Sequence, residues 1–358
     1  MRTIGIEEEL LLVSPDGCST RQVGDTICAA HEDDSWLTRE LKRDQLEIRT
    51  DPTASISEAL EQLHTRRRIV DVYAQEHDAR IVSLGTTPLR TKPKTVPVER
   101  YEKITAEYGV IGRNQLSCGA HVHVDVESDA EAVGVIDRIR AWLPPLLALS
   151  ANSPFWNGSV TGFASFRSQL FSMLPTTGYQ ELFGTPEAYH THVENLVNTG
   201  VVHGKAMIYF PVRLSNNFPT VEVRVMDGSL DARTTVLLAA LVRALVETAA
   251  REWRAGTPAD PVSAEVLRVA SWRASKFGLS GDLLHPREHR PRSAEVVVAA
   301  LVDHVRLALA EAGDDDFVDT ELERLWTTRG GAGLQREVHH RAGELVDVVR
   351  EAIPLALS

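Results

Sequence analysis

The strongest constraint on the fold of this chain is the alternation of apolar and ligand-bearing residues in widely separated segments. In residues 119–127, GAHVHVDVE, small apolar residues alternate with His121 and His123. Residues 220–226, TVEVRVM, repeat the design with valines opposite Glu222. Because successive side chains of a strand point to opposite faces, each segment predicts a half-buried strand with one polar face. Strands of this kind are typical of a mainly antiparallel sheet that is covered on one side.

Two further segments continue the pattern near the N-terminus. Residues 3–13 place Glu7 and Glu9 on one face of an expected strand, and residues 45–49 place Glu47 on the polar face of another. An exposed strand face usually carries Ser, Thr, Lys and mixed charges, whereas these faces carry strong metal ligands. The recurrence of one design in several strands therefore predicts a common ligand-rich face.

Two charged features do not fit the alternating pattern. Glu8 interrupts the apolar face of the first strand, and Arg66-Arg67-Arg68 form a basic run within a helical pattern. We interpret the basic run as the solvated face of a helix.

Helix signals dominate the last third of the chain. Capping residues, prolines in first turns and closing glycines mark the ends of the expected helices. The expected helices are Ser55 to about 79, Ser128 to the Pro144-Pro145 pair, one from Thr185-Pro186, Asp231 to Gly256, 263–277, 293–312 and 334–353. We expect a strand at 81–85 and a flexible loop at 330–333, GGAG. The sequence thus predicts one α+β domain over residues 1–358, with a helix-rich C-terminal part from about residue 231.

Composition narrows the classes of partner. The formal net charge is −12, which argues against a nucleic-acid surface or an anionic membrane as partner. The longest apolar stretch, Val236 to Val246, is interrupted by Arg243, so no membrane span is expected. Three cysteines without framework spacing indicate a reducing compartment, and Met1 leads directly into a strand pattern without an apolar signal region. We expect a cytoplasmic protein.

The chemistry of the ligand-rich face favours a divalent cation. Side chains two residues apart on a strand, such as Glu7 and Glu9, are separated by about 6–7 Å of backbone rise, which suits two ions or one bridged ion. Carboxylates with imidazole favour magnesium or manganese over zinc. Alone, the E-x-E motif could be a charged edge strand and the H-x-H motif a packed histidine pair. Taken together, the strands predict a metal site whose ligands are Glu7, Glu9, Glu47, His121 and Glu222.

Three polar residues outside this ligand set have two interpretations each. Arg224 shares a face with Glu222, so it could clamp a phosphate or form a structural salt bridge with that glutamate. Asn152 and Arg167 lie among aromatic and small residues, which suits a substrate pocket wall and equally a loop packing cluster.

Five ordered motifs carry a family resemblance. They are GIEEELLLV (5–13), CGAHVHV (118–124), ALSANSPFW (148–156), FASFRS (163–168) and PTVEVRVMD (219–227). In this order they resemble the carboxylate-amine ligases of the glutamate-cysteine ligase type 2 family, which in turn resembles glutamine synthetase. The resemblance implies a curved, mainly antiparallel sheet flanked by helices, in a single catalytic domain.

The resemblance also implies an activity and residue roles. It implies ATP-dependent amide formation, in which a substrate carboxylate, typically that of glutamate, attacks the γ-phosphate and an amine displaces phosphate from the acyl phosphate. It assigns Mg²⁺, with Mn²⁺ as a possible substitute, to the five metal positions named above. Glu9 and Arg224 match catalytic positions, and His123 and Arg224 match positions that face the ATP phosphates. Small-molecule amino acids as substrates and a homodimer are further implications.

Two departures from the family pattern leave the substrate pair open. The chain reads Phe210-Pro211-Val212-Arg213 where relatives commonly carry an acidic residue, and GSLDART follows Asp227 in place of a cysteine- or proline-containing turn. A non-catalytic amino-acid or nucleotide sensor on the same scaffold is therefore a second hypothesis. A third is a cupin-like metal oxygenase, because His121-x-His123 followed by Glu127 imitates its ligand spacing.

Overall fold

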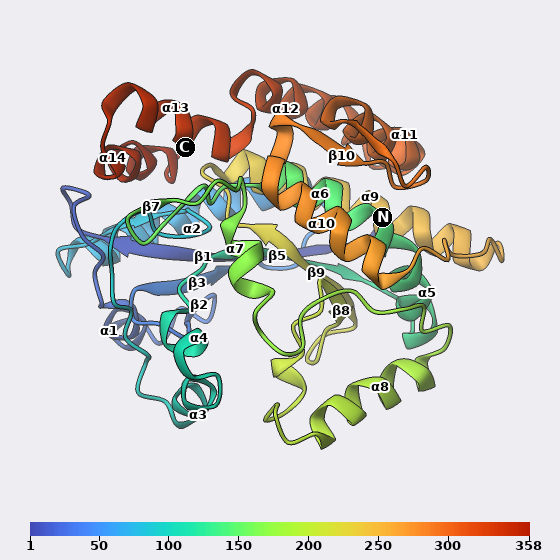
Figure 1. Cartoon of the computed structure of the whole chain (residues 1–358), viewed down its shortest axis with the longest axis horizontal. Coiled ribbons are helices and arrows are strands. Elements are labelled where there is room, and N and C mark those ends of the chain that lie inside the picture. Colours follow the sequence, from blue (N-terminus) through green and yellow to red (C-terminus); the bar gives the residue numbers. More distant parts are fainter.

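A single antiparallel sheet forms the centre of the protein (Figure 1). The structure is a computed structural model that describes all residues, 1–358. The strand order is β2-β3-β1-β5-β9-β8, and β4 pairs with the end of β1. The strands are β1 Ile4–Val13, β2 Leu37–Arg39, β3 Gln45–Arg49, β4 Arg80–Val82, β5 Gly119–Asp125, β8 Val212–Leu214 and β9 Thr220–Asp227. The predicted antiparallel arrangement is confirmed, although β4 ends at Val82, three residues before the end of the strand expected at 81–85.

The register of the sheet brings the predicted ligand residues together. Glu7 of β1 lies opposite His121 of β5, and Glu9 lies opposite Glu47 of β3. Across the next ladder, His123 of β5 lies opposite Glu222 of β9. Antiparallel pairing places directly opposite side chains on the same face, so all four strands contribute to one polar surface.

A register shift in β9 corrects one detail of the predicted alternation. Ala120 pairs with Met226 and Val122 with Val223, so Arg224 and Val225 together oppose one residue of β5. Such a bulge redirects the side chains that follow it. Met226 consequently enters the core, whereas strict alternation from Glu222 through Arg224 would place it on the polar face.

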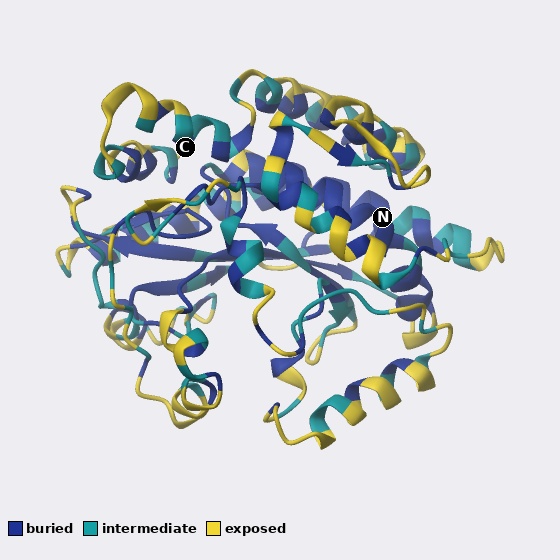
Figure 2. Ribbon diagram, in the orientation of Figure 1, coloured by how far each residue is buried: buried dark blue, intermediate teal, exposed yellow.

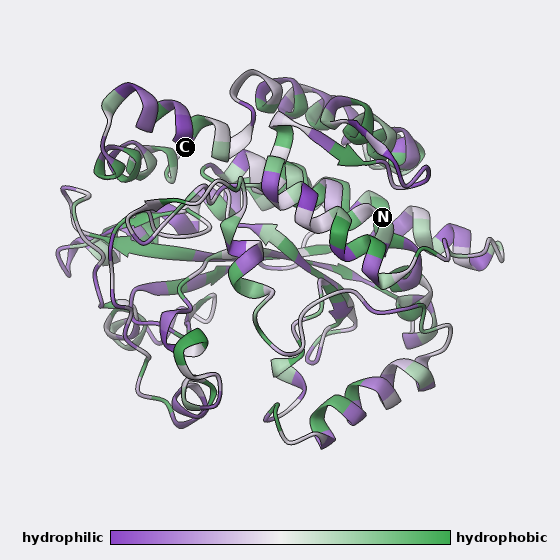
Figure 3. Ribbon diagram, in the orientation of Figure 1, coloured by the Kyte–Doolittle hydropathy of each residue, from purple (hydrophilic) through white to green (hydrophobic).

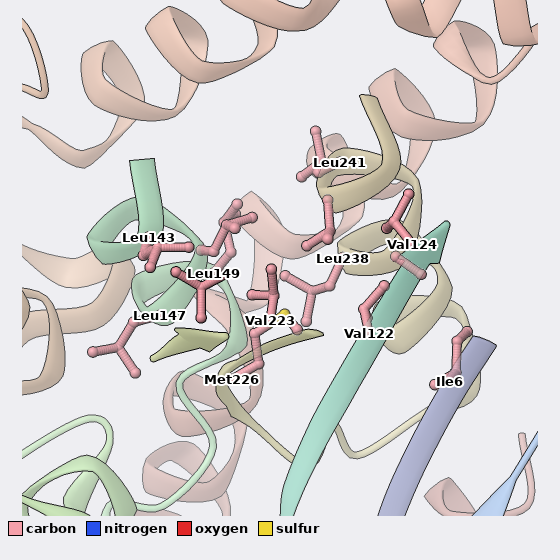
Figure 4. Close-up of a cluster of buried hydrophobic side chains, with 14 of the residues drawn as sticks. Ile6, Val122, Val124, Leu143, Leu147, Leu149, Val223, Met226, Leu238 and Leu241 are labelled. Atoms are coloured by element: carbon pink, nitrogen blue, oxygen red, sulfur yellow. The ribbon is translucent and has the colours of Figure 1, made fainter. Parts of the chain in front are cut away.

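Helices cover the apolar face of the sheet. The long helix α9 (Ala232–Arg254) contacts β1 and β5, and α2 (Ile56–Gln75), α5 (Asp129–Ile139), α6 (Leu143–Ser150) and α11 (Ala294–Ala312) pack beside it. Figure 4 shows valines of β5 and β9 meeting leucines of α6 and α9. The strands are mostly buried and apolar, whereas the peripheral helix α8 (Pro186–Asn198) alternates in both exposure and hydropathy (Figures 2 and 3). The main core cluster extends from Ile4 to Ala356. Among the C-terminal helices, α11 and α12 (Asp315–Thr328) pack on α9, and α14 (Leu345–Leu355) contacts β4.

The remaining helices frame the opposite side of the sheet or complete the C-terminal part. They are α1 Gly24–Ala30, α3 Glu99–Glu107, α4 Gly109–Asn114, α7 Phe166–Phe171, α10 Ala264–Phe277, α12 Asp315–Thr328, α13 Gly330–Ala342 and α14 Leu345–Leu355. The pairs β6 Phe155–Trp156 with β7 Ser159–Val160 and β10 Asp282–Leu284 with β11 Pro291–Ser293 form two small hairpins. No helix has both the length and the apolar character needed to span a membrane.

Helix starts follow the predicted caps. Ser55, Ser128, Thr185 and Asp231 each accept a hydrogen bond from a first-turn N–H, which satisfies a donor that no helical carbonyl can reach.

Three expected boundaries are wrong. Pro144 and Pro145 begin α6 and do not end the preceding helix, because a first turn tolerates a residue without an N–H. The GGAG run at 330–333 is the first turn of α13, and not a flexible loop. The helix expected at 334–353 is two helices, which are divided at Gly343 with φ at +87°.

The interpretation of the basic run as a solvated helix face is also wrong. Arg66 and Arg67 are buried in the structure, and only Arg68 is exposed. Arg67 pairs with Glu8, the residue that interrupted the apolar pattern of the first strand.

Candidate active site

A cavity of about 340 Å³ lies against the polar face of the sheet. Strands β1, β3, β5 and β9 supply its floor, and α3, the end of α7 and the β8–β9 connection supply its walls. All the predicted metal and phosphate residues line it, namely Glu7, Glu9, Glu47, His121, His123, Glu222 and Arg224. The structure thus brings together residues that are up to 217 positions apart in the chain, since Glu7 and Arg224 share this cavity.

The acidic and imidazole side chains form three overlapping groups, in each of which the ligand atoms lie within 4.8 Å of one another. The first is Glu7, His123 and Glu222; the second is Glu7, Glu47 and His121; the third is Glu9, Glu40 and Glu47. Glu7 joins the first two groups and Glu47 joins the last two. This sharing is the geometry expected where neighbouring cations are bridged by carboxylates.

The histidines have nitrogen atoms that suit metal binding. His121 Nε2 and His123 Nε2 are buried and have no hydrogen-bond partner. His123 Nδ1 lies 2.9 Å from the Thr220 hydroxyl, a contact that orients the ring. A buried polar atom without a partner is costly, and a metal ion would use its lone pair. The donor set therefore fits divalent metal ions.

Mutual repulsion among the carboxylates supports the same assignment. Burial, together with the charges of Glu7 and Glu40, raises the pKa of Glu47 well above its ordinary value. Burial and the neighbouring Glu9 raise the pKa of Glu40 to about 8. A cation placed among these groups would remove the repulsion and keep the carboxylates ionised.

Two arginines of the cavity, Arg213 and Arg224, neutralise the negative charge of Glu222. Arg213 Nε donates to Glu222 Oε2 at 2.8 Å, and Arg224 forms an ion pair with the other oxygen of the same carboxylate. Burial would raise the pKa of Glu222, but Arg224 and Arg213 outweigh it and hold that pKa well below its usual range. Burial and Arg224 lower the pKa of His121, so the imidazole stays neutral and available as a ligand. Arg224 thus forms the salt bridge with Glu222 and also lines the cavity, so its position is compatible with both interpretations.

A second cavity, of about 260 Å³, adjoins the first and shares Phe171, Tyr209 and Arg224 with it. Arg167 lines this second cavity and is buried, yet its Nε has no hydrogen-bond partner. Its nearest carboxylate is Asp227, with Oδ1 at 3.9 Å from Arg167 NH1, and its guanidinium lies over the Phe171 ring. An incompletely paired buried guanidinium is suited to an anionic ligand group.

Asn152 does not line either of these cavities. Its Nδ2 donates to the carbonyls of Ser83 and Gly228, and its Oδ1 accepts from Gln335 Nε2 at 2.6 Å. These contacts fix the segment around Asn152 against β4, the turn after β9 and α13. The alternative interpretation of Asn152, as part of a packing cluster, fits these contacts.

Several cavity residues lay outside the sequence prediction. Glu40 completes the third ligand group, and Arg100, Tyr101 and Tyr209 line the walls. The one available signal for Glu40 was its position seven residues before Glu47, on the other side of a short turn between β2 and β3.

The two departures from the family pattern lie close to the site. Pro211 lines the second cavity, and its carbonyl accepts the backbone N–H of Arg224 at 2.8 Å. Gly228 donates its N–H to the carbonyl of Cys118, and its own carbonyl accepts from Asn152. Neither departure removes a ligand from the three groups.

Comparison with known proteins identifies the family. The sequence profile of the family described as glutamate-cysteine ligase family 2 matches residues 3–351 of this chain. The chain belongs to this family. A protein of Streptomyces avermitilis, named "Putative glutamate--cysteine ligase 2-1", is 43% identical over 357 residues, which cover 99% of each chain. A Streptomyces coelicolor protein, named "Putative glutamate--cysteine ligase 2", is 45% identical over 357 residues, covering 99% of this chain and 98% of the relative.

Solved structures agree on the fold. A glutamate–cysteine ligase of Francisella tularensis in complex with AMP superposes with a TM-score of 0.68 at 14% identity, covering all of this chain and 89% of that chain. A bifunctional glutathione synthetase of Pasteurella multocida superposes with a TM-score of 0.71 at 15% identity; it covers 99% of this chain, which spans 52% of that longer chain. The expected ligase fold of the family is confirmed. The cupin-like alternative is wrong, because the H-x-H strand belongs to this α+β sheet and not to a jelly roll.

Proposed function

We propose that this member of the ligase family uses ATP and divalent cations to join the carboxylate of an amino acid to an amine, with glutamate and cysteine as the first pair to test. The observation that carries the proposal is the set of three ligand groups that line one cavity with Arg224. Glu7 links the first group to the second, and Glu47 links the second to the third. Two anions, a carboxylate and a triphosphate, must approach one another in this reaction, and clustered positive charge makes that approach possible.

In the proposed arrangement Glu7, Glu9, Glu47, His121 and Glu222 hold Mg²⁺ or Mn²⁺, with Glu40 as an additional ligand. When bound, the ions would neutralise phosphate charge and orient the γ-phosphate toward the attacking carboxylate. Glu9 acts as a catalytic residue through its place in this site. Arg224, at the junction of the two cavities, is suited to contact the transferred phosphate, and His123 is suited to the neighbouring phosphates.

A third hollow offers room for the nucleoside. It measures about 430 Å³, lies between α8 and the β8–β9 connection, and shares Arg213 and Phe218 with the metal cavity. Val193 and Ile208 provide apolar surface for a base, and Lys205 provides a cation. A nucleotide placed here would direct its phosphates past Phe218 and His123, whose rings meet edge to face.

The amino acid that supplies the carboxylate is assigned to the second cavity. Arg167 would bind its α-carboxylate, while its reacting carboxylate extends toward Arg224. The aromatic side chains of Tyr209 and Phe171 line both cavities. A cytoplasmic location and a homodimer remain predictions of the sequence. Sedimentation analysis of the purified protein would test the homodimer.

The direct experiment combines purified protein, ATP and Mg²⁺ with pairs drawn from a panel of amino acids and amines. We expect release of ADP and phosphate together with an amide product for at least one pair that contains an acidic amino acid. Omission of the amine should reduce phosphate release. Absence of turnover with every pair, in protein that binds ATP, would contradict the proposal and favour the sensor hypothesis.

The sensor hypothesis makes a distinct prediction. A sensor would bind an amino acid or nucleotide in calorimetry without consuming ATP. We rank it second, because a sensor does not require three overlapping groups of metal ligands.

A further inference from the structure

A charged residue lies beneath the proposed metal ligands, on the opposite face of their strand. Glu8 stands between Glu7 and Glu9 in β1, and its neighbours across the ladders are Ile48 and Ala120. Its side chain has no exposed surface. Any displacement of Glu8 along the strand would therefore move the two adjacent carboxylates as well.

Arg67 of α2 is the partner of Glu8 and is equally buried. Its Nε donates to Glu8 Oε2 at 2.8 Å and its NH2 donates to Oε1 at 2.7 Å. The remaining N–H groups donate to the carbonyls of Ser229 at 3.1 Å, Leu230 at 3.3 Å and Ala356 at 3.1 Å. All five donors of the guanidinium are used, so its position is fully determined.

These contacts tie together four segments, two of which, β1 and the end of β9, carry residues of the site. Besides β1 and α2, Arg67 holds the turn that directly follows β9, the strand of Glu222 and Arg224, and it holds the C-terminal end of the chain. The Thr235 hydroxyl, near the start of α9, donates to Glu8 Oε1 at 2.5 Å. In the turn after β9, a Cβ at Gly228 would lie 3.5 Å from the carbonyl oxygen of Glu9, so this turn packs directly on β1.

Stability by itself is a weak reason for such a pair. Two buried charges lose their hydration, and well-packed apolar residues of similar volume are often equally stabilising or more so. What apolar side chains do not supply is a fixed, bidentate distance between a strand and its neighbours.

We infer that Glu8 and Arg67 are positioning residues for the metal site, which set β1 against the end of β9 so that Glu7 and Glu9 keep their spacing toward His121 and Glu222. The inference rests on the metal site of the proposed function. It assigns a purpose to the charge that interrupts the apolar face of β1 and to the buried member of the basic run.

The test measures Mn²⁺ affinity, by electron paramagnetic resonance, and the thermal midpoint of the same folded samples. The variants are Glu8→Gln, which retains the shape of the side chain, Arg67→Lys, and the milder Thr235→Val. Arg243→Lys is the matched control, because Arg243 and Asp314 form another buried ion pair whose residues do not line the metal cavity.

We expect Glu8→Gln and Arg67→Lys to weaken Mn²⁺ binding by about 10- to 100-fold, the usual effect of removing a residue that orients metal ligands, and Thr235→Val to weaken it less. Arg243→Lys should lower the thermal midpoint but leave the Mn²⁺ affinity unchanged.

Unchanged affinity in folded Glu8→Gln would overturn the inference, even if Arg67→Lys failed to fold. An equal loss of affinity in Arg243→Lys would also overturn it, since the effect would then follow from lower stability. If the unaltered protein does not bind Mn²⁺, the proposed metal site itself is refuted. If the unaltered protein binds Mn²⁺ and Glu8→Gln binds it equally well, only the positioning role is refuted.

Discussion

Substitution of Gly119 by alanine should displace the side chain that we assign to substrate binding. Gly119 begins β5, and a Cβ built there would lie 2.1 Å from Arg167 NH2 and 2.7 Å from Arg167 Cζ, well under the 3.0 Å limit of real contacts. The backbone of β5 is held between β1 and β9, so the guanidinium must move. Arg167 would then lose its place beside Asp227 and over Phe171.

The size of the effect follows from the contacts that are lost. A hydrogen bond to a charged group contributes about 1.5–3 kcal/mol, so the KM for the acidic amino acid should rise by about 10- to 100-fold. Overpacking at this site should lower the free energy of unfolding by about 1–3 kcal/mol. Mn²⁺ affinity should remain unchanged, because alanine keeps the backbone N–H that Gly119 donates to Glu9 Oε2 at 2.6 Å and because Arg167 does not line the metal cavity.

The assay is the rate of ADP release at saturating ATP over a range of amino-acid concentrations, with urea unfolding of the same samples. Gly5→Ala is the matched control in the adjacent strand, since a Cβ there meets only His123 Cβ, at an ordinary 3.9 Å. An unchanged KM in folded Gly119→Ala would refute the assignment of Arg167 to the substrate carboxylate. An equal rise of KM in Gly5→Ala would show that the effect is not specific to Arg167.

Three other predictions concern charge and metal. Glu222→Gln should abolish turnover and lower the free energy of unfolding in urea by about 3–5 kcal/mol, because Arg213 and Arg224 lose a buried partner; unchanged stability would contradict the ion-pair geometry. Mn²⁺ at 100 times its dissociation constant should stabilise the protein by about 2.7 kcal/mol in thermal unfolding, reversibly with a chelator, and the absence of any shift would count against the site. Burial and Arg287 lower the pKa of His304 to about 4 from 6.5. The unfolded chain then binds more protons than the folded one between these values, so stability should fall as the pH decreases from 6.5 toward 4. His304→Gln should flatten that dependence in urea unfolding, and an unchanged slope would exclude His304 as its source.

The strands of the site could be predicted because alternation is a local property of the sequence. A half-buried strand must place every second residue in the core, so the polar faces of β1, β3, β5 and β9 could be predicted from their own residues. Their assembly around one cavity needed only that they share a sheet.

Features that depend on pairing or on irregular backbone could not be predicted in this way. The bulge at Arg224 and Val225 results from how β9 pairs with β5, and it moves Met226 into the core. Glu40 lies beyond the end of β2, where no period indicates its direction. Asn152 and Arg167 had the same kind of sequence surroundings, but tertiary contacts turn Arg167 toward a cavity and hold Asn152 in a packing cluster.

The burial of Arg67 has a similar explanation. A helical pattern with three consecutive arginines contains no information on which of them meets an unpaired carboxylate across the core. That carboxylate belongs to Glu8, on the apolar face of β1. The two residues meet because α2 packs against this face, which is a tertiary contact that neither local pattern indicates.

The most direct test of the central claim is a crystal structure with Mn²⁺ and a non-hydrolysable ATP analogue, using the anomalous signal of manganese to locate the ions. We predict anomalous peaks among the three ligand groups, with Glu7 and Glu47 each bridging neighbouring positions and the γ-phosphate facing Arg224. Anomalous peaks elsewhere, or an empty carboxylate cluster at saturating Mn²⁺ and nucleotide, would contradict the proposal that this face of the sheet is a metal-dependent phosphate-transfer site.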